Sequence, residues 1–141
     1  MATEENRQIN KLKILIVEDD ETSEMLISIA VRALSKEILK VRTGADAIET
    51  CRNNPDLDLI LMDIKMPEMD GYEATRQIRQ FNNGVYIIAQ TAFGLVEERE
   101  KALDAGCNEY ISKPMDIALL RMMIQKQFNI EAQNSRNIGT N

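Results

Sequence analysis

The sequence predicts an α/β fold in which a parallel β-sheet is covered by helices on both of its faces. Five apolar runs of strand length alternate with segments whose apolar residues recur every three or four positions. A chain of 141 residues, 44% of them hydrophobic, has the size of one domain and enough apolar residues for a buried core. We therefore expect one domain built from five consecutive β/α units.

The first β/α unit begins with the apolar run LKILIV. This run predicts a strand over Leu12–Val17, and a helix with an apolar stripe follows from Glu21. The stripe is broad, so we expect it to pack on the sheet. Its expected members are Met25, Leu26, Ile29, Ala30, Ala33 and Leu34.

Four shorter apolar runs supply the remaining strands, which are expected at Ile38–Val41, Leu57–Met62, Val85–Ala89 and Tyr110–Ser112. A helical segment follows each strand and ends at residues that disfavour a helix. The helix after the second strand ends before Pro55. The next helix is expected over Gly71–Phe81, before a break that ends in Gly84. The helix around Glu97–Ala105 ends at Gly106, and one last helix follows the fifth strand.

Both ends of the chain are polar and lack apolar periodicity. We expect residues 1–9 to form a flexible segment, residues 10–129 to form the folded domain, and residues 130–141 to be a polar tail or linker remnant. No apolar run of membrane-spanning length and no signal peptide occur. The sequence therefore predicts a cytoplasmic location and no membrane contact by this domain.

The composition disfavours several classes of function. Histidine is absent, which removes the commonest general base, histidine-activated nucleophiles and most transition-metal sites. The 17 basic and 23 acidic residues give a net charge of −6 without a Lys/Arg cluster, so we expect no direct nucleic-acid binding. Cys51 and Cys107 are expected to be buried thiols rather than parts of a disulfide or metal site.

Polar residues follow the predicted strands at the edge where parallel sheets bind ligands. Asp20 is expected to cap the next helix, whereas the other acids would repel one another unless a cation lies between them. Magnesium suits such an all-oxygen site, and calcium is disfavoured because no DxDxDG loop occurs. The polar residues at this edge are Glu18, Asp19, Asp20, Asp63, Thr91 and Lys113.

The same residues suit a phosphoryl group. Lys113 would place a positive charge opposite the metal ion, and Thr91 would offer a hydroxyl donor to the phosphoryl oxygens. The carboxylate of Asp63 is then the nucleophile at the centre of the site and can form an acyl phosphate. Phosphoryl transfer needs in-line positioning and charge neutralisation, so the absence of histidine is no obstacle.

Four segments of the chain resemble the response-regulator receiver domains of two-component signalling. They are ILIVEDDE at 14–21, ILMDIKMPEMDGYEATRQIR at 60–79, AQTAFG at 89–94 and AGCNEYISKP at 105–114. The resemblance covers about residues 11–128. It implies a doubly wound, flavodoxin-like fold with five helices and a five-stranded parallel sheet in the order 2-1-3-4-5.

The resemblance also implies roles for individual residues around a magnesium ion. Asp63 corresponds to the phosphoacceptor, which takes a phosphoryl group from a phosphohistidine and also binds Mg²⁺. Asp19 corresponds to a direct Mg²⁺ ligand, and Glu18 corresponds to a ligand that acts through a water molecule. The backbone carbonyl of Lys65 completes the ligands that the protein supplies.

Further residues correspond to the switch of the family. Thr91 matches the hydroxyl that moves to the phosphoryl group, and Tyr110 matches the aromatic residue coupled to it. Lys113 matches the phosphate-pairing lysine before Pro114, where a cis peptide bond is expected. Gly71 is expected to supply backbone freedom after the site. Phosphorylation would reshape the face formed by residues 93–128, where we expect an output partner to bind.

Two of the segments resemble receivers attached to hybrid sensor histidine kinases. The expected phosphohistidine donor is a histidine kinase or a histidine phosphotransfer protein. We expect the chain to be the cytoplasmic part of a hybrid kinase, with a stand-alone single-domain response regulator as the alternative. The domain by itself is expected to perform only Mg²⁺-dependent phosphorylation and dephosphorylation of its own aspartate and not to act as an enzyme.

Three residues near the site extend or depart from the family pattern. Gln90 stands where relatives commonly carry an apolar residue, so either its amide finds a partner near the site or it lies at the exposed end of the strand. Phe93 and Lys65 flank the mouth of the site, where a bulky ring hinders attack by water. We therefore expect the phosphoryl group to persist for minutes or longer.

Three alternative functions remain weaker interpretations of these residues. An aspartyl-phosphate phosphatase needs a second acid two residues beyond the nucleophile, where this chain has Lys65. A flavin- or nucleotide-binding domain needs a glycine-rich phosphate loop, and only six glycines occur in the chain. A degenerate receiver that only docks partners is disfavoured by the complete set of acids, Thr91 and Lys113.

Overall fold

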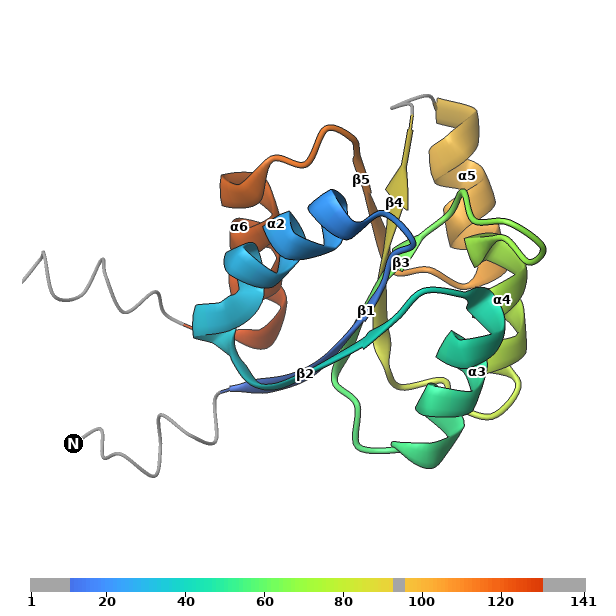
Figure 1. The fold of residues 1–141 in the computed structure, drawn as a ribbon, viewed down its shortest axis with the longest axis horizontal. Coiled ribbons are helices and arrows are strands. Elements are labelled where there is room, and N and C mark those ends of the chain that lie inside the picture. The colour runs from blue at the N-terminus through green and yellow to red at the C-terminus, as the bar shows by residue number, and fades with distance from the viewer. Residues whose placement is uncertain (1–10, 93–95, 131–141) are drawn as a thin grey trace, which may run out of the picture.

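Five parallel strands form the centre of the structure, a computed structural model that describes residues 11–92 and 96–130 (Figure 1). The strands are β1 (Leu12–Val17), β2 (Ser35–Val41), β3 (Leu59–Asp63), β4 (Tyr86–Thr91) and β5 (Glu109–Ser112). Within these residues the helices are α2 (Glu21–Val31), η1 (Arg32–Leu34, a 3-10 turn), α3 (Gly44–Asn53), α4 (Gly71–Arg79), α5 (Val96–Ala105) and α6 (Ile117–Phe128). None of these helices is long and apolar enough to cross a membrane.

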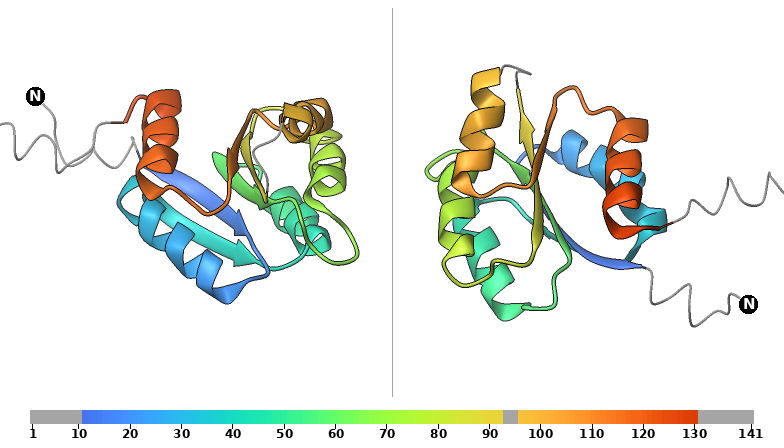
Figure 2. Two further views of the ribbon diagram at one scale, coloured as in Figure 1. Left: turned by 90° about the horizontal axis from the view of Figure 1, so that it is seen from above. Right: turned by 180° about the vertical axis from the view of Figure 1, so that it is seen from behind.

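The strand order of the sheet is β2-β1-β3-β4-β5, and every neighbouring pair of strands is parallel. Helices α2 and α6 cover one face of the sheet, and α3, α4 and α5 cover the other (Figures 1 and 2). Each parallel connection needs a crossover, which these helices provide. The predicted fold class and the strand order implied by the family resemblance are confirmed.

Two apolar clusters fill the space between the sheet and its two helical layers. Successive residues of a strand point to opposite faces, so Ile14 packs under α2 and α6 whereas Leu15 packs under the other layer. Cys51 and Cys107 are buried free thiols, as expected, and belong to the cluster that contains Leu15 and lies beneath α3, α4 and α5. The continuous burial of β1 and β3 explains why their sequences are apolar without alternation.

The strands reach further toward the polar residues than the apolar runs indicated. β3 ends at Asp63 rather than Met62, and β4 ends at Thr91 rather than Ala89. The side chains of Asp63 and Thr91 are nearly inaccessible, at 2% and 1% exposure of the residue. The ladder hydrogen bonds of the sheet therefore hold two of the predicted site residues directly.

The apolar stripe expected on α2 is wrong in part. Met25, Leu26 and Ile29 are 55%, 43% and 44% exposed. The residues that pack on the sheet instead recur at the i, i+3, i+4, i+7 spacing of one helix face. They are Ile27, Ala30, Val31 and Leu34, of which only Ala30 and Leu34 belong to the predicted stripe.

Helix α4 ends at Arg79, two residues before the end expected at Phe81. Phe81 is 39% exposed and does not continue the buried face of the helix. The guanidinium carbon of Arg52 lies 4.7 Å from the centroid of the Phe81 ring. A cation–π contact with α3 therefore holds this ring at the surface.

Candidate functional site

The acidic residues expected to hold a metal ion meet at the carboxyl end of the sheet. Glu18 and Asp19 follow β1, and Asp63 is the last residue of β3. One carboxylate oxygen from each of these residues lies within 4.8 Å of the other two. Glu18 and Asp63 are buried whereas Asp19 is exposed, so the cluster opens to solvent on one side.

Lys113 adds a positive charge to this cluster. Its Nζ lies 3.1 Å from Oδ1 of Asp63 and 3.5 Å from Oε1 of Glu18. The backbone amide of Lys113 donates a hydrogen bond of 2.7 Å to the carbonyl oxygen of Thr91, which ties the start of the β5–α6 turn to β4. The peptide bond between Lys113 and Pro114 is cis, as expected.

Backbone hydrogen bonds hold the first acids in place. The backbone amide of Glu18 donates to the carbonyl oxygen of Val41 in β2, and Oε2 of Glu18 accepts from the amide of Asp20, both at 3.1 Å. The carboxylate of Asp20 accepts a hydrogen bond of 2.8 Å from the amide of Ser23. Asp20 therefore caps α2, as expected, and is not one of the three clustered acids.

Gly71, the first residue of α4, packs directly against the end of β3. A Cβ atom at this position would overlap the carbonyl oxygen of Asp63 and lie 2.9 Å from Cα of Ile64. Gly71 is not among the residues with positive φ in the described part of the chain. The predicted need for backbone freedom is therefore wrong, because glycine is required here for close approach of the backbones.

Burial raises the pKa values of the two buried acids of the cluster, Glu18 and Asp63. The pKa of Glu18 is raised to about 7, first by burial and then by the negative charge of Asp63. Burial also raises the pKa of Asp63, and Asp19 adds to this, although Lys113 opposes it. Burial lowers the pKa of Lys113, but attraction to Asp63 and Glu18 outweighs burial and leaves that pKa raised.

A hard divalent cation fits this set of side chains. Three carboxylates face one ammonium group, so the cluster keeps excess negative charge. Oε1 of Glu18 is buried and makes no hydrogen bond with the residues that the structure describes. All the clustered atoms are oxygens, which Mg²⁺ prefers, and the exposed Asp19 leaves space for the waters that this ion retains.

The other predicted site residues lie in β4, in β5 and in the loop after β3. Thr91 is buried at the end of β4, and Tyr110 is half-buried in β5, where it packs on the apolar cluster beneath α3, α4 and α5. Lys65 is exposed in the loop two residues beyond Asp63. Phe93, on which the expected phosphoryl lifetime depends, lies outside the described residues.

Gln90 fits neither of the two expected environments. The residue is 1% exposed, and its Nε2 atom has no hydrogen-bond partner among the described residues. Its side chain borders a cavity of about 160 Å³ that Lys113 also lines. The amide directly after the apolar run Val85–Ala89 was the signal in the sequence, but only the structure shows that this amide is buried and that its Nε2 is unpaired.

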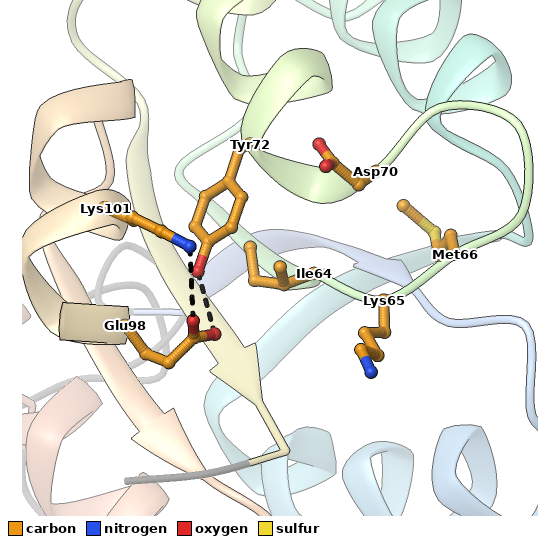
Figure 3. A pocket seen from close by; sticks show the side chains of 7 residues that line it. All are labelled: Ile64, Lys65, Met66, Asp70, Tyr72, Glu98 and Lys101. Atoms are coloured by element: carbon orange, nitrogen blue, oxygen red, sulfur yellow. Dashed lines mark hydrogen bonds and ion pairs between the residues drawn. The ribbon is translucent and has the colours of Figure 1, made fainter. Parts of the chain in front are cut away.

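A second, larger pocket of about 550 Å³ lies beside the loop after Asp63 (Figure 3). In this pocket the hydroxyl of Tyr72 in α4 donates a hydrogen bond of 3.1 Å to Oε1 of Glu98 in α5. Nζ of Lys101 lies 3.8 Å from Oε2 of the same glutamate (Figure 3). The pKa of Tyr72 is raised to about 12, first by burial and then by Glu98. No pattern in the sequence pairs these residues.

Comparisons of the sequence with known proteins agree with the geometry. The family model of the response regulator receiver domain matches residues 14–125. The chain is 34% identical over 134 residues to hybrid signal transduction histidine kinase L of Dictyostelium discoideum, covering 89% of this chain and 8% of that protein. It is 35% identical over 106 residues to the polar-differentiation response regulator DivK of Brucella ovis, covering 74% of this chain and 85% of DivK.

Two solved structures share the fold. The receiver domain of sensor histidine kinase PA1611 from Pseudomonas aeruginosa, solved with a magnesium ion in the active site cleft, is 38% identical, with a TM-score of 0.75 over 84% of this chain and 98% of that one. The receiver domain of Saccharomyces cerevisiae Ssk1, in complex with the histidine phosphotransfer protein Ypd1, belongs to a structure that matches at 29% identity with a TM-score of 0.77, over 83% of this chain and 88% of that one.

Proposed function

Because the chain belongs to the response regulator receiver domain family, we propose that its acidic cluster accepts a phosphoryl group from a phosphohistidine onto Asp63. Receivers are the phosphoacceptor domains of two-component phosphorelays. The observation that supports Asp63 as the acceptor is its position: the buried carboxylate lies among the oxygens of Glu18 and Asp19 and 3.1 Å from Nζ of Lys113.

The proposed reaction is an in-line displacement at phosphorus. A carboxylate oxygen of Asp63 attacks, a P–O bond forms, and the P–N bond of the phosphohistidine breaks with its electron pair remaining on the imidazole nitrogen. The ammonium of Lys113 lies close enough to Asp63 to pair with an oxygen of the phosphoryl group. The same charge favours the ionised form of Asp63, which the attack requires.

A magnesium ion bound here would neutralise the charge that collects on the acids and the phosphoryl oxygens. We propose that the carboxylates of Asp19 and Asp63 hold it directly, that Glu18 acts through a water molecule, and that the Lys65 carbonyl adds a ligand. The oxygens clustered within 4.8 Å support this assignment. The magnesium ion in the cleft of the similar PA1611 receiver also supports it.

We propose that Thr91 and Tyr110 pass the phosphorylation signal to the face formed by residues 93–128, where an output partner binds. The new negative charge on Asp63 would draw the hydroxyl of Thr91 inward, and Tyr110 would follow. One hydrogen bond and one strand position support this proposal. The backbone amide of Lys113 donates to the carbonyl oxygen of Thr91, and Tyr110 lies in β5, the strand that pairs with β4.

We propose that residues 10–129 form the receiver of a hybrid sensor histidine kinase, in the cytoplasm, with residues 1–9 and 130–141 as flanking segments. The similarity to the PA1611 receiver and to hybrid kinase L supports this, and the chain spans only 8% of that kinase. The parent chain would then be a histidine protein kinase. DivK, of which the chain covers 85%, supports the stand-alone alternative. A kinase module encoded upstream in the same reading frame would decide between them.

The proposed donor is a histidine kinase or a histidine phosphotransfer protein, as the complex of Ypd1 with the Ssk1 receiver suggests.

The test of Asp63 as the phosphoacceptor incubates the wild-type chain and the Asp63→Asn variant with Mg²⁺ and a phosphorylated histidine phosphotransfer protein, and separately with acetyl phosphate. We expect the wild-type chain to become phosphorylated on aspartate and the Asp63→Asn variant to remain unphosphorylated. A phosphate-affinity gel and mass spectrometry detect the phosphoryl group. Asp104→Asn, an exposed acid of α5, is the matched control. Phosphate on the Asp63→Asn variant would refute the assignment.

A further inference from the structure

The pocket of about 550 Å³ beside the loop after Asp63 has the size of a small-molecule site (Figure 3). Ligand pockets in proteins usually measure about 300–1,000 Å³. The loop after β3, the start of α4 and the first half of α5 surround this pocket. It therefore adjoins the last residue of β3, which belongs to the acidic cluster, but no step of the proposed phosphoryl transfer uses it.

The inner wall of this pocket is apolar. Ile64 and Met66 line it and are only 3% and 8% exposed. The ring of Tyr72 lies beside Ile64 (Figure 3) and packs on the same apolar cluster. A tyrosine ring and a methionine sulfur both make favourable contacts with aromatic rings. The wall therefore favours an aromatic ring as the apolar part of a ligand.

Three of the four charged side chains that line the pocket already have partners. The carboxylate of Glu98 accepts a hydrogen bond from Tyr72 and lies 3.8 Å from Nζ of Lys101. Oδ1 of Asp70 accepts a hydrogen bond of 2.9 Å from a backbone amide of α4. The ammonium of Lys65 makes no hydrogen bond or ion pair with the residues that the structure describes, and no dashed line reaches it in Figure 3.

The ammonium of Lys65 determines which charge the pocket accepts. An anion can pair with it without breaking an existing contact. In Figure 3 Lys65 and Glu98 lie on opposite sides of Ile64, so an anion at Lys65 stays apart from the carboxylate of Glu98. Asp70 is exposed in the same pocket and disfavours further negative charge. A carboxylate with one charge therefore fits better than a phosphate ester, which carries about −1.5 to −2.

Lys65 also connects the pocket with the acidic cluster, because its backbone carbonyl is a proposed Mg²⁺ ligand while its side chain lines the pocket. The preceding residue is fixed: the amide of Ile64 donates to the carbonyl oxygen of Gln90 at 3.1 Å, and its own carbonyl accepts from Gly71 at 2.9 Å. An anion paired with Lys65 would restrain the next residue of this loop and cancel a positive charge near the cation. Both effects favour Mg²⁺ binding.

We propose that this pocket binds a small aromatic carboxylate, which pairs with Lys65 and packs its ring on Ile64, Met66 and Tyr72. The bound carboxylate strengthens Mg²⁺ binding at the acidic cluster, and Mg²⁺ strengthens carboxylate binding by the same factor. The pocket is then a regulatory site for the phosphoacceptor. This coupling rests on the proposed function, because it requires Mg²⁺ at Asp63, whereas the binding of the carboxylate does not.

The first experiment measures ligand binding without Mg²⁺. The probes are 2-naphthoate and its neutral analogue 2-naphthalenemethanol, which have two fused rings because a cavity of about 150 Å³ already holds one benzene ring. Each is titrated into isotope-labelled chain, and NMR follows the backbone amides of Met66, Tyr72 and Lys101. We expect 2-naphthoate to bind about threefold more tightly than the alcohol, as an exposed ion pair allows.

The Lys65→Met variant is expected to bind the two probes equally. Lys126→Met is the matched control, because Lys126 is an exposed lysine that lines a different pocket beside α6, and it is expected to keep the preference of the wild type. If 2-naphthoate does not shift the amides of Met66, Tyr72 and Lys101, or if Lys65→Met keeps the preference, the assignment of the pocket is overturned.

The second experiment measures the coupling. Mg²⁺ is titrated calorimetrically into wild-type chain with and without saturating 2-naphthoate, and 2-naphthoate is titrated with and without saturating Mg²⁺. We expect each to raise the affinity for the other about fivefold, the low end of the range usual for coupled sites, and Lys65→Met to abolish the effect. A Mg²⁺ affinity that stays the same or falls when 2-naphthoate is bound would overturn the regulatory role.

The outcomes separate this inference from the proposed function. A wild-type chain that binds Mg²⁺ and accepts phosphate but does not bind 2-naphthoate would overturn the pocket while leaving Asp63 as the phosphoacceptor. A chain that binds 2-naphthoate but neither Mg²⁺ nor phosphate would refute the proposed function and the coupling, and would leave the carboxylate site. The Asp63→Asn variant is expected to keep 2-naphthoate binding in the absence of Mg²⁺.

Discussion

The ammonium group of Lys113 lies 3.1 Å from Oδ1 of Asp63, although 50 residues of sequence separate them. It also lies 3.5 Å from Oε1 of Glu18, so one lysine faces two buried carboxylates. The parallel strands bring these residues to one edge of the sheet. Because a divalent cation would use the same carboxylate oxygens, Lys113 and the cation repel each other across the site.

Replacing Lys113 by methionine is expected to strengthen Mg²⁺ binding about fivefold, because a repulsion of roughly 1 kcal/mol is removed. The same change is expected to slow phosphorylation by acetyl phosphate about tenfold or more, because the phosphoryl oxygens lose a cationic partner. Isothermal titration with Mg²⁺ measures the first effect, and phosphate-affinity gels measure the second. Lys101→Met is the control. Weaker Mg²⁺ binding by Lys113→Met would contradict the proposed repulsion.

The stability of the metal-free protein is expected to fall as pH rises from about 4.5 to about 7. Glu18 has its pKa raised from 4.5 to about 7, so in this window the folded protein binds more protons than the unfolded chain. Linkage then lowers the free energy of unfolding with rising pH, by up to about 3 kcal/mol for this group. Asp63, whose pKa is also raised, acts in the same direction.

Urea unfolding at several pH values, with and without Mg²⁺, checks this dependence. The Glu18→Gln variant is expected to have a flatter profile, because its amide cannot ionise. Saturating Mg²⁺ is expected to restore most of the stability that the wild type loses near neutral pH. A metal-free wild-type protein that gains stability between these pH values would show that Glu18 and Asp63 are not held in this buried, repulsive arrangement.

Gly71→Ala is expected to destabilise the fold by about 1–3 kcal/mol, because the new methyl group would overlap the Asp63 backbone and force α4 away. Phosphorylation is expected to slow as well, since the same overlap presses on the backbone of Asp63, the proposed phosphoacceptor. Gly84→Ala is the matched control, because a Cβ there would meet only Oδ1 of Asn82 at 4.0 Å. Equal unfolding midpoints for the two variants would exclude the steric role of Gly71.

The sequence was sufficient for the fold class and for the clustering of the acids with Lys113, because both depend on local signals. Parallel strands were recognised from continuous apolar runs, and the acids that follow β1 had to lie at one edge once the sheet was parallel. The same edge then had to hold Asp63 and Lys113, whose contact the structure shows. The order of the strands came from the family resemblance and not from the apolar pattern.

The remaining features depend on contacts between distant parts of the chain. The apolar stripe of α2 was misassigned because helical spacing gave two overlapping faces, and only packing on the sheet selects the one with Ile27. The need for Gly71 is set by the Asp63 backbone, and the lack of a partner for Gln90 is set by the surrounding side chains. Neither the close approach at Gly71 nor the missing partner of Gln90 can be predicted from residue type or sequence spacing.

The hydrogen bond between Tyr72 and Glu98 ties the first turn of α4 to the first turn of α5, which belongs to the proposed output face (Figure 3). Tyr72→Phe removes only the hydroxyl and is expected to cost about 1 kcal/mol in urea unfolding. Tyr86→Phe is the matched control, because its ring keeps the edge-to-face contact with Phe128, with centroids 5.8 Å apart.

Loss of the Tyr72 hydroxyl is also expected to speed amide hydrogen exchange in the first turn of α5, while exchange in α6 stays unchanged, because the lost bond holds only α5 to α4. Glu98→Gln keeps an acceptor oxygen for Tyr72 and is expected to show a smaller effect. If Tyr72→Phe and Tyr86→Phe lose the same stability and exchange at the same rate in α5, the hydrogen bond does not restrain this helix.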